Sequence, residues 1–301
     1  MKKKAEAIDG VFLLDKGYGV SSNYALQKVR RSINAKKAGH TGTLDPMATG
    51  LLPLCFGNAT KFSADLLHAD KGYEARVRLG ITTTTGDREG RVVSQVEVHV
   101  TEEALRAAAA KFLGRIEQVP PMYSALKRNG EALYEIARRG RTVEREPRRV
   151  TIHALRIRDF DGQRFTMSCL VSKGTYIRVL GEDIGKALGV GAHLTALRRT
   201  RVGDLTIENA VTRQALDEAL EQGSEAARAL LAPVDFLLRS LEAIHLDSRQ
   251  TTRFMHGQRL MLAVGAVQRE GLVRVYGADG HFLGTAQWEA SGRLSPQRLM
   301  S

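Results

Sequence analysis

The sequence predicts an α+β protein with a mixed, mainly antiparallel sheet flanked by helices, followed by a small C-terminal β-barrel. Two observations support this fold class. Runs with an apolar residue at every second position are interspersed with runs whose apolar residues recur at helical spacing, so strands and helices are mixed along the chain. One strand-like run, 151–160, passes into the next through Asp161-Gly162, a dipeptide typical of hairpins. The hairpin favours antiparallel pairing over a doubly wound parallel sheet.

The first half of the chain contains two predicted helices and one predicted strand. The first helix spans Ser22 to Ile33, starts at a serine cap, and has one apolar face formed by Leu26, Val29 and Ile33. The strand begins at Tyr73, and its buried face would consist of Tyr73, Ala75, Val77 and Leu79. The second helix opens at Thr101, which precedes two glutamates, and continues through Phe112.

The second half repeats this mixture and ends in short strands. Period-two alternation returns in Phe165, Met167, Cys169 and Val171, and helical spacing follows in Ile177, Leu180, Ile184 and Leu188. Residues 211–238 are Ala-rich, acidic and more helical, and strand-like runs return at 259–264, 272–276 and 282–287. We therefore expect two domains, 1–240 and 241–301, the second being the small barrel.

The segment 39–62 has the most informative composition. It reads GHTGTLDPMATGLLPLCFGNATKF and places one carboxylate, Asp45, among glycines, hydroxyl groups and a single histidine. Pro46 disfavours helical geometry at Asp45 and suits the first position of a helix, which would make Asp45 an N-cap. Met47, Leu51 and Leu54 would then form the buried stripe of that helix. The residues alone leave two interpretations open: a catalytic carboxylate and a plain helix cap.

The charge of the chain points to a polyanionic partner. The sequence has 45 Lys and Arg against 33 Asp and Glu, a formal net charge of +12, and nucleic acid is the leading candidate partner. The alternative is a basic surface without a specific role. The basic residues are clustered, however, with eight Lys and Arg against four Glu between 127 and 149 and a second group at Arg198, Arg199 and Arg201.

Several classes of protein find no support in the sequence. Cys55 and Cys169 lie far apart without a companion at ligand spacing, so we expect buried thiols, no disulfide framework, no metal site and no other cofactor. The basic start is followed only by the short run VFLL, so we expect no membrane association and a cytoplasmic protein. The absence of a P-loop motif argues against an NTPase.

The run GHTGTLDPMATGLLP at 39–53 closely resembles the catalytic motif of the bacterial tRNA pseudouridine synthases of the TruB type. These enzymes isomerise the T-loop uridine at tRNA position 55. The resemblance covers about the first 240 residues as a catalytic domain with the pseudouridine synthase fold. It covers the last 60 residues more weakly, as a PUA-like RNA-binding domain. It implies base flipping without a guide RNA; we expect a monomer that binds the T arm of tRNA and needs no obligate protein partner.

The resemblance assigns three residues to catalysis. Asp45 matches the catalytic aspartate, which could attack the ribose, attack the base or take a ribose proton. Arg178, in SKGTYIR, matches the arginine that pairs with this aspartate and keeps it ionised, and Tyr176 lies close to it in the same motif. Without the resemblance, Arg178 would be a solvated helix-face charge. Tyr73, in KGYEA, matches the tyrosine that stacks on the flipped base, although periodicity alone would place it in the core.

Further positions carry over to substrate binding. His40 would occupy space left in the T loop when bases flip, and otherwise would be an ordinary hydrogen-bonding residue. Asp87, in TGD, matches a position of the active-site network, but Gly-Asp is also common in turns. Lys61, in ATKF, is expected to support substrate or structure, and Leu197, in HLTALRRT, to pack beside the base.

The basic segment at about 123–149, which follows a Pro-Pro pair, resembles the family's mobile insertion that clamps the RNA arm. The phosphate-binding residues expected there are Lys127, Arg138, Arg139 and Arg141. From charge alone, a solvated helix and loop would fit this segment equally well, because glutamates interrupt it.

Two functions of other classes compete with the synthase. An RNA-binding chaperone or ribonucleoprotein subunit would use the fold for recognition only, but the retained Asp45 argues against loss of chemistry. The long basic insertion also resembles the self-sufficient bacterial form. A hydrolase of nucleoside glycosidic bonds would need two suitably placed carboxylates or a carboxylate-rich metal cluster, and the sequence indicates neither.

Overall fold

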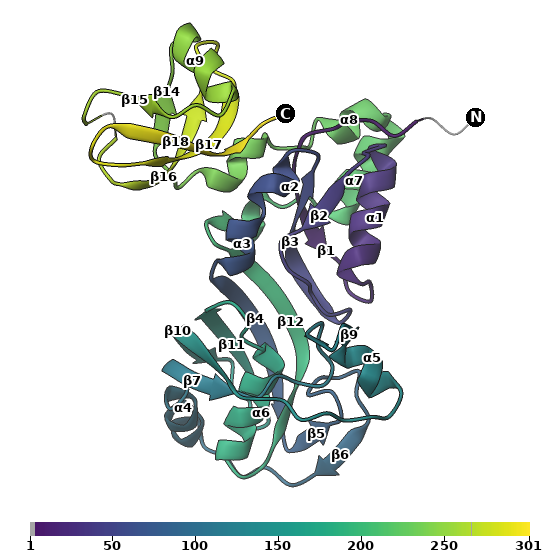
Figure 1. Cartoon of the computed structure of the whole chain (residues 1–301). Helices are drawn as coiled ribbons and strands as arrows, with labels where there is room; N and C mark the ends of the chain where they lie inside the picture. Colours follow the sequence, from purple (N-terminus) through teal and green to yellow (C-terminus); the bar gives the residue numbers. More distant parts are fainter. Residues whose placement is uncertain (1–3, 266) are drawn as a thin grey trace.

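The chain is described from a computed structural model that covers residues 4–265 and 267–301, with only the backbone at residue 65. Its main feature is a nine-stranded mixed sheet, which Figure 1 shows running through the length of the larger part of the molecule. The central order is β1 (Gly10–Lys16), β3 (Ala48–Phe56), β12 (Ala192–Val202), β4 (Lys71–Leu79), β11 (Arg164–Val171), β10 (Arg148–Arg158) and β7 (Gly114–Gln118). Two short strands pair at the side, β2 (Ala38–His40) with β3 and β13 (Leu205–Thr206) with β12.

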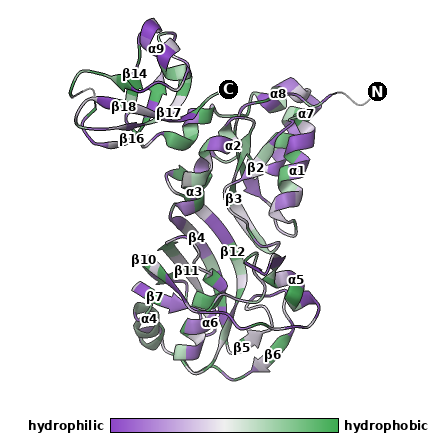
Figure 2. Cartoon of the chain, viewed as in Figure 1, coloured by the Kyte–Doolittle hydropathy of each residue, from purple (hydrophilic) through white to green (hydrophobic). Residues whose placement is uncertain are grey.

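The pairing in this sheet is mainly antiparallel, as predicted. The β3–β12 pair is parallel, and every other described pair in the sheet is antiparallel, including the predicted β10–β11 hairpin. The predicted strand faces are also confirmed: Ala75, Val77 and Leu79 of β4 and Phe165, Met167 and Cys169 of β11 are buried. Figure 2 shows hydrophilic residues interspersed with these hydrophobic ones along β4.

Helices cover the sheet and share its core. The predicted helices are present as α1 (Ser22–Ser32), capped by the Ser21 side chain, α4 (Glu102–Ala110), capped by Thr101, and α6 (Ile177–Ala187). The helical region after residue 211 contains α7 (Arg213–Glu221), α8 (Ser224–Arg228) and the 3-10 turn η2 (Val234–Leu238). Leu26 and Val29 of α1, Leu105 of α4 and Leu180 and Ile184 of α6 belong to one buried cluster with the strands.

The helix expected after Pro46 is wrong, because residues 48–56 form strand β3. Met47, Leu51 and Leu54 are buried as predicted, but so are Leu52, Cys55 and Phe56, since β3 is covered on both faces. A strand buried on both faces places apolar residues at every spacing, including the helical one. Asp45 therefore caps no helix; it lies in the turn before β3, where its carbonyl accepts a hydrogen bond from the Ala48 N–H.

The C-terminal part forms a separate curled sheet with its own core. The strand order is β14 (Ala243–His245), β16 (Gly271–Tyr276), β17 (Phe282–Trp288), β18 (Arg293–Leu299) and β15 (Leu260–Met261), with α9 (Ser248–Met255) beside it. Trp288 and Phe254 are fully buried in this core. It meets the rest of the chain through an edge-to-face contact of Phe282 with Phe62, at 5.3 Å between ring centroids. The division into domains at residue 240 stays a prediction.

Smaller elements lie outside the two sheets. They are α2 (Ala59–Phe62), α3 (Ala64–His68), the hairpin β5 (Ile81–Thr83) with β6 (Val92–Gln95), the hairpin β8 (Lys127–Arg128) with β9 (Glu131–Ala132), α5 (Leu133–Arg138) and the 3-10 turn η1 (Ile207–Asn209). Both cysteines are buried free thiols, as expected, and burial raises the pKa of each to about 12. Within the described part of the chain, none of the helices has the length and apolar character of a membrane span.

Candidate active site

The structure brings five of the predicted site residues to one pocket. Asp45, Tyr73, Tyr176, Arg178 and Leu197 line a cavity of about 150 Å³. They come from the loop before β3, from β4, from the start of α6 and from β12, so they are distant in sequence. The parallel β3–β12 pair contributes directly, because Leu197 is in register with Ala48, three residues after Asp45.

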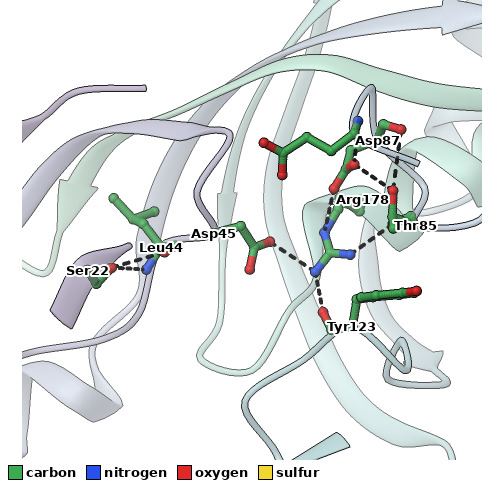
Figure 3. A network of polar contacts seen from close by, with 8 residues as sticks. Ser22, Leu44, Asp45, Thr85, Asp87, Tyr123 and Arg178 are labelled. Carbon is green, nitrogen blue, oxygen red and sulfur yellow. Dashed lines mark hydrogen bonds and ion pairs between the residues drawn. The ribbon is translucent and has the colours of Figure 1, made fainter. Parts of the chain in front are cut away.

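The loop that carries Asp45 leads into β3, which packs closely against β12. Gly50 has φ +100°, and a Cβ atom there would lie 2.2 Å from the Arg199 carbonyl oxygen. Only glycine permits this approach. Beside the loop, the Ser22 Oγ accepts a hydrogen bond from the Leu44 N–H at 2.7 Å and donates one to the Leu44 carbonyl at 3.0 Å (Figure 3). The residue next to Asp45 is thus tied to the first turn of α1.

Arg178 is the centre of a buried polar network (Figure 3). Its side chain is 4% exposed, and its Nη2 lies 2.9 Å from Oδ2 of Asp45 while its Nε lies 3.7 Å from Oδ2 of Asp87. Nη1 donates to the Thr85 carbonyl at 2.8 Å and Nη2 to the Tyr123 carbonyl at 2.6 Å. The guanidinium group is therefore held by two carboxylates and two backbone carbonyl groups, and its Nη2 atom points toward Asp45.

Asp45 and Asp87 differ in their access to the pocket. Asp45 is 37% exposed and lines the cavity, whereas Asp87 is 5% exposed on the far side of the guanidinium. Oδ1 of Asp87 also accepts hydrogen bonds from the Thr85 hydroxyl at 2.6 Å and the Glu89 N–H at 3.0 Å. Asp87 can hold Arg178 in place, and Asp45 is the carboxylate that a substrate in the pocket can reach.

The two tyrosines present neutral phenols to the pocket. Burial raises the pKa of Tyr73 above its usual value, and the neighbouring Arg199 guanidinium offsets this only in part. Burial likewise raises the pKa of Tyr176. Leu197 is buried and supplies an apolar wall. Flat aromatic and apolar surfaces next to one carboxylate suit a planar base.

Two buried basic residues near Asp45 were missed from the sequence. Lys16 is 1% exposed, and its Nζ donates to the carbonyl oxygens of Gly17 at 2.9 Å and Val20 at 2.8 Å; burial lowers its pKa to about 8 although Asp45 opposes this shift. Arg199 is 1% exposed, and it donates from Nε to the Leu51 carbonyl at 2.8 Å and from Nη2 to the Gly42 carbonyl at 3.1 Å. Arg199 thus holds both sides of the Asp45 loop. Nothing in the charge pattern distinguishes these residues from surface charges.

The second basic group is not the free positive patch that its clustering indicated. Arg199 is buried, Arg198 forms an ion pair with Asp15 at 2.7 Å, and Arg201 lies 3.7 Å from Asp204.

His40 and Lys61, both expected to bind substrate, are among the predicted residues that lie outside the pocket lining. His40 is half-buried at the end of β2, its Nδ1 accepts a 3.4 Å hydrogen bond from the Gly42 N–H, and burial lowers its pKa. Lys61 donates to the Leu299 carbonyl at 3.0 Å and the Ser301 hydroxyl at 3.1 Å. These contacts hold the end of the C-terminal strand; the sequence led us to expect support of either substrate or structure at this position.

The basic segment forms a small unit beside the pocket. Its hairpin β8–β9 and helix α5 pack around buried Leu133 and Ile136. Ser124 and Ala125, at its start, line the pocket that contains Asp45. Arg138 lies over the Tyr134 ring at 5.4 Å and Arg139 pairs with Glu131. Its expected binding residues are exposed: Lys127, Arg138, Arg139 and Arg141.

Family models and curated relatives of one kind match this chain along almost its whole length. Residues 30–177 match the family model described as TruB family pseudouridylate synthase (N terminal domain), 178–239 match tRNA pseudouridylate synthase B C-terminal domain, and 243–300 match Pseudouridine synthase II TruB, C-terminal. The tRNA pseudouridine synthase B of Burkholderia mallei (strain NCTC 10247) is 57% identical over 98% of this chain and 97% of its own. That of Cupriavidus metallidurans is also 57% identical, over 97% of this chain and 94% of its own.

A solved structure shares the fold over nearly the whole length. A chain in the crystal structure of a Cbf5-Nop10-Gar1 complex superposes with a TM-score of 0.71 at 25% identity and covers 96% of this chain and 84% of its own. The described fold is thus shared with a solved structure over nearly the whole chain.

Proposed function

The chain belongs to the TruB family of pseudouridylate synthases, and on this premise we propose that it converts the T-loop uridine at tRNA position 55 to pseudouridine, with Asp45 as the catalytic group. The observation that carries the proposal is the ion pair of 2.9 Å between Asp45 and the buried Arg178, at a pocket that Tyr73 and Leu197 also line. Relatives named tRNA pseudouridine synthase B support tRNA as the substrate.

The reaction needs a flipped uridine, because the enzyme must reach atoms that stacking hides. In the proposed complex the uracil ring stacks on Tyr73 and Leu197 packs beside it. The bond between N1 of uracil and C1′ of ribose breaks, the ring turns, and a bond forms between C5 and C1′. C5 then gives up its proton and N1 gains one, so the product is an isomer of the substrate. An ionised Asp45 serves as the nucleophile at ribose or base, or as the base that takes a ribose proton.

Arg178 and the residues around the loop position this carboxylate. A guanidinium at 2.9 Å favours the charged form of Asp45 when substrate displaces water from the pocket. Its bonds to the Thr85 and Tyr123 carbonyls prevent it from swinging away. Tyr123 lies at the start of the basic segment, so Arg178 joins the reacting group to the element that we propose clamps the RNA.

The remaining assignments follow from the same proposal. Lys127, Arg138, Arg139 and Arg141 bind phosphates of the T arm, and His40 occupies space that the flipped bases leave. The C-terminal sheet is a PUA-like RNA-binding domain. The protein acts in the cytoplasm as a monomer, without a guide RNA or an obligate protein partner.

One experiment tests the proposed function against its competitors. Unmodified tRNA is incubated with the purified protein alone, pseudouridine is mapped along the tRNA, and free uracil is measured. Pseudouridine at position 55 without free uracil is the expected result. Tight binding without product would support an RNA chaperone instead, and released uracil would support a glycosidic hydrolase.

A further inference from the structure

A second cavity, of about 750 Å³, opens on the side of the main sheet away from α6. Helix α6 packs on the face that carries Val77 and Leu194, because a Cβ atom at Gly181 would lie 2.5 Å from Leu194 and 3.8 Å from Val77. Side chains alternate along a strand, so Arg76 and Arg78 of β4 point to the opposite face. The cavity is lined by Arg76, Arg78, Arg88, Asp159, Asp161, Arg164, Phe165, Thr166, His193 and Thr195.

The four arginines of this cavity outnumber its two aspartates. Within the described residues, none of the four guanidinium groups forms an ion pair, whereas their neighbours Arg158 and Arg198 pair with Glu74 and Asp15. Both aspartates have other partners as well, and Arg164 acts electrostatically on Asp161. Asp159 lies 3.6 Å from Arg158, and Asp161 accepts backbone N–H groups of residues 163 and 164.

The spacing of these arginines concentrates positive charge. Arg76 and Arg78 are two residues apart on one strand, roughly 7 Å. Arg164 is in direct register with Arg78 on the neighbouring strand. Gathering like charges in one concave site is unfavourable unless an anion binds there, and such a site raises the local concentration of anions.

The cavity adjoins the active-site network through one loop. Asp87 of this loop faces Arg178, and the next residue, Arg88, lines the cavity and lies over the Tyr18 ring at 5.6 Å. The Arg88 N–H donates to the Leu194 carbonyl at 2.9 Å, which fixes the loop on β12. The loop that holds Arg178 in place thus also contributes an arginine to the cavity.

We propose that this cavity binds phosphate groups of the substrate RNA outside the loop that carries the reacting uridine. The proposal rests on the proposed function. The ligand is a phosphodiester backbone, because guanidinium groups match phosphate oxygens in charge and geometry. Tyr73 of the Asp45 pocket lies on the same face of the sheet as Ala75 and Val77, the face covered by α6, whereas the cavity arginines lie on the opposite face. A single short RNA loop therefore does not fill both the Asp45 pocket and the cavity. A flanking part of the same tRNA occupies the second.

The first test compares Arg76→Gln/Arg164→Gln with Arg106→Gln/Arg213→Gln. All four arginines are exposed, but Arg106 and Arg213 lie outside the cavity and pair with Glu102 and Asp217. Affinity is measured across a salt series for full-length unmodified tRNA and for an isolated T-arm stem-loop.

For full-length tRNA we expect the cavity variant to bind on the order of tenfold more weakly at 0.1 M salt, with the log–log salt slope reduced by about 1.5 for two lost phosphate contacts. Its affinity for the stem-loop should equal that of the control variant. The same affinity and slope as the control on full-length tRNA, or an equal loss on both RNAs, would overturn the proposal.

A crosslink identifies the RNA segment directly. Cys55 and Cys169 are buried, so Thr195→Cys places one accessible thiol at the cavity, to which a short photo-crosslinker is attached. Adducts to tRNA nucleotides outside the T loop support the inference, and adducts to the T loop alone or none at all contradict it. Pseudouridine formation by the wild-type protein on the stem-loop, measured in parallel, tests the proposed function independently of the cavity.

Discussion

Replacement of Arg178 by methionine should cost both stability and activity. The change removes a 4% exposed guanidinium and leaves Asp87, itself 5% exposed, without its opposing charge. It also removes the donors to the carbonyl oxygens of Thr85 and Tyr123. Loss of one partner from a buried ion pair costs about 3–5 kcal/mol. Asp87 keeps two other hydrogen bonds, and water screens Asp45, so we expect a value near the lower end, about 3 kcal/mol.

Urea unfolding followed by circular dichroism measures the free energy of unfolding, and single-turnover pseudouridine formation measures the rate of reaction. Arg178→Lys is the matched control, because it keeps the charge but one ammonium group cannot contact Asp45, Asp87 and both carbonyls together. We expect it to lose less stability than the methionine variant and still to lose at least about a hundredfold in rate, since it misplaces the charge beside Asp45. A methionine variant within about 1 kcal/mol of wild type, or a fully active lysine variant, would refute this account of the network.

Three further perturbations test other parts of the structure. Gly50→Ala should lower the unfolding free energy by more than about 3 kcal/mol, because its Cβ atom would overlap the Arg199 carbonyl oxygen. The control, Gly162→Ala, also has a positive φ of +93° but open space around it, and should cost only about 1 kcal/mol. Similar urea midpoints for the two variants would contradict this. Burial raises the pKa of Glu182 from 4.5 to about 7, so its contribution to stability is fully present below about pH 4.5 and is lost as the pH rises through 7. Glu182→Gln should therefore remove a fall of about 2–3 kcal/mol between pH 4.5 and 7.5, and an unchanged pH profile of unfolding would argue against this burial. Neutralising three exposed arginines of the basic segment, Arg138, Arg139 and Arg141, should weaken RNA binding and lower the slope of log affinity against log salt by about 2. An unchanged slope would exclude the proposal that this segment clamps the RNA.

Periodicity predicted the elements of the fold that have one buried and one exposed face. Helices α1, α4 and α6 and strands β4 and β11 all have such a face, and each appears where the pattern placed it. The pattern failed at β3, where burial on both faces makes helical and strand spacing indistinguishable. The burial of β3 depends on β12, about 150 residues away, and a local pattern contains no information about that partner.

The site was predicted in the same partial way. Asp45, Arg178, Tyr73 and Leu197 came from the family resemblance, and the fold explains why they meet at one pocket. Residue types alone would have left Arg178 on a solvated helix face. Lys16 and Arg199 were missed because their charges are buried against backbone carbonyl oxygens, and sequence shows a charge but not what surrounds it.

The central claim is that Asp45 performs the chemistry while the rest of the site binds and positions the RNA. Asp45→Asn tests it most directly, because the amide has nearly the same shape but is neither nucleophile nor base. Pseudouridine at position 55 is measured in a single turnover of unmodified tRNA, with binding measured on the same samples. We predict wild-type-like binding and no product above background. Substantial pseudouridine at that position from the asparagine variant would contradict the assignment of Asp45.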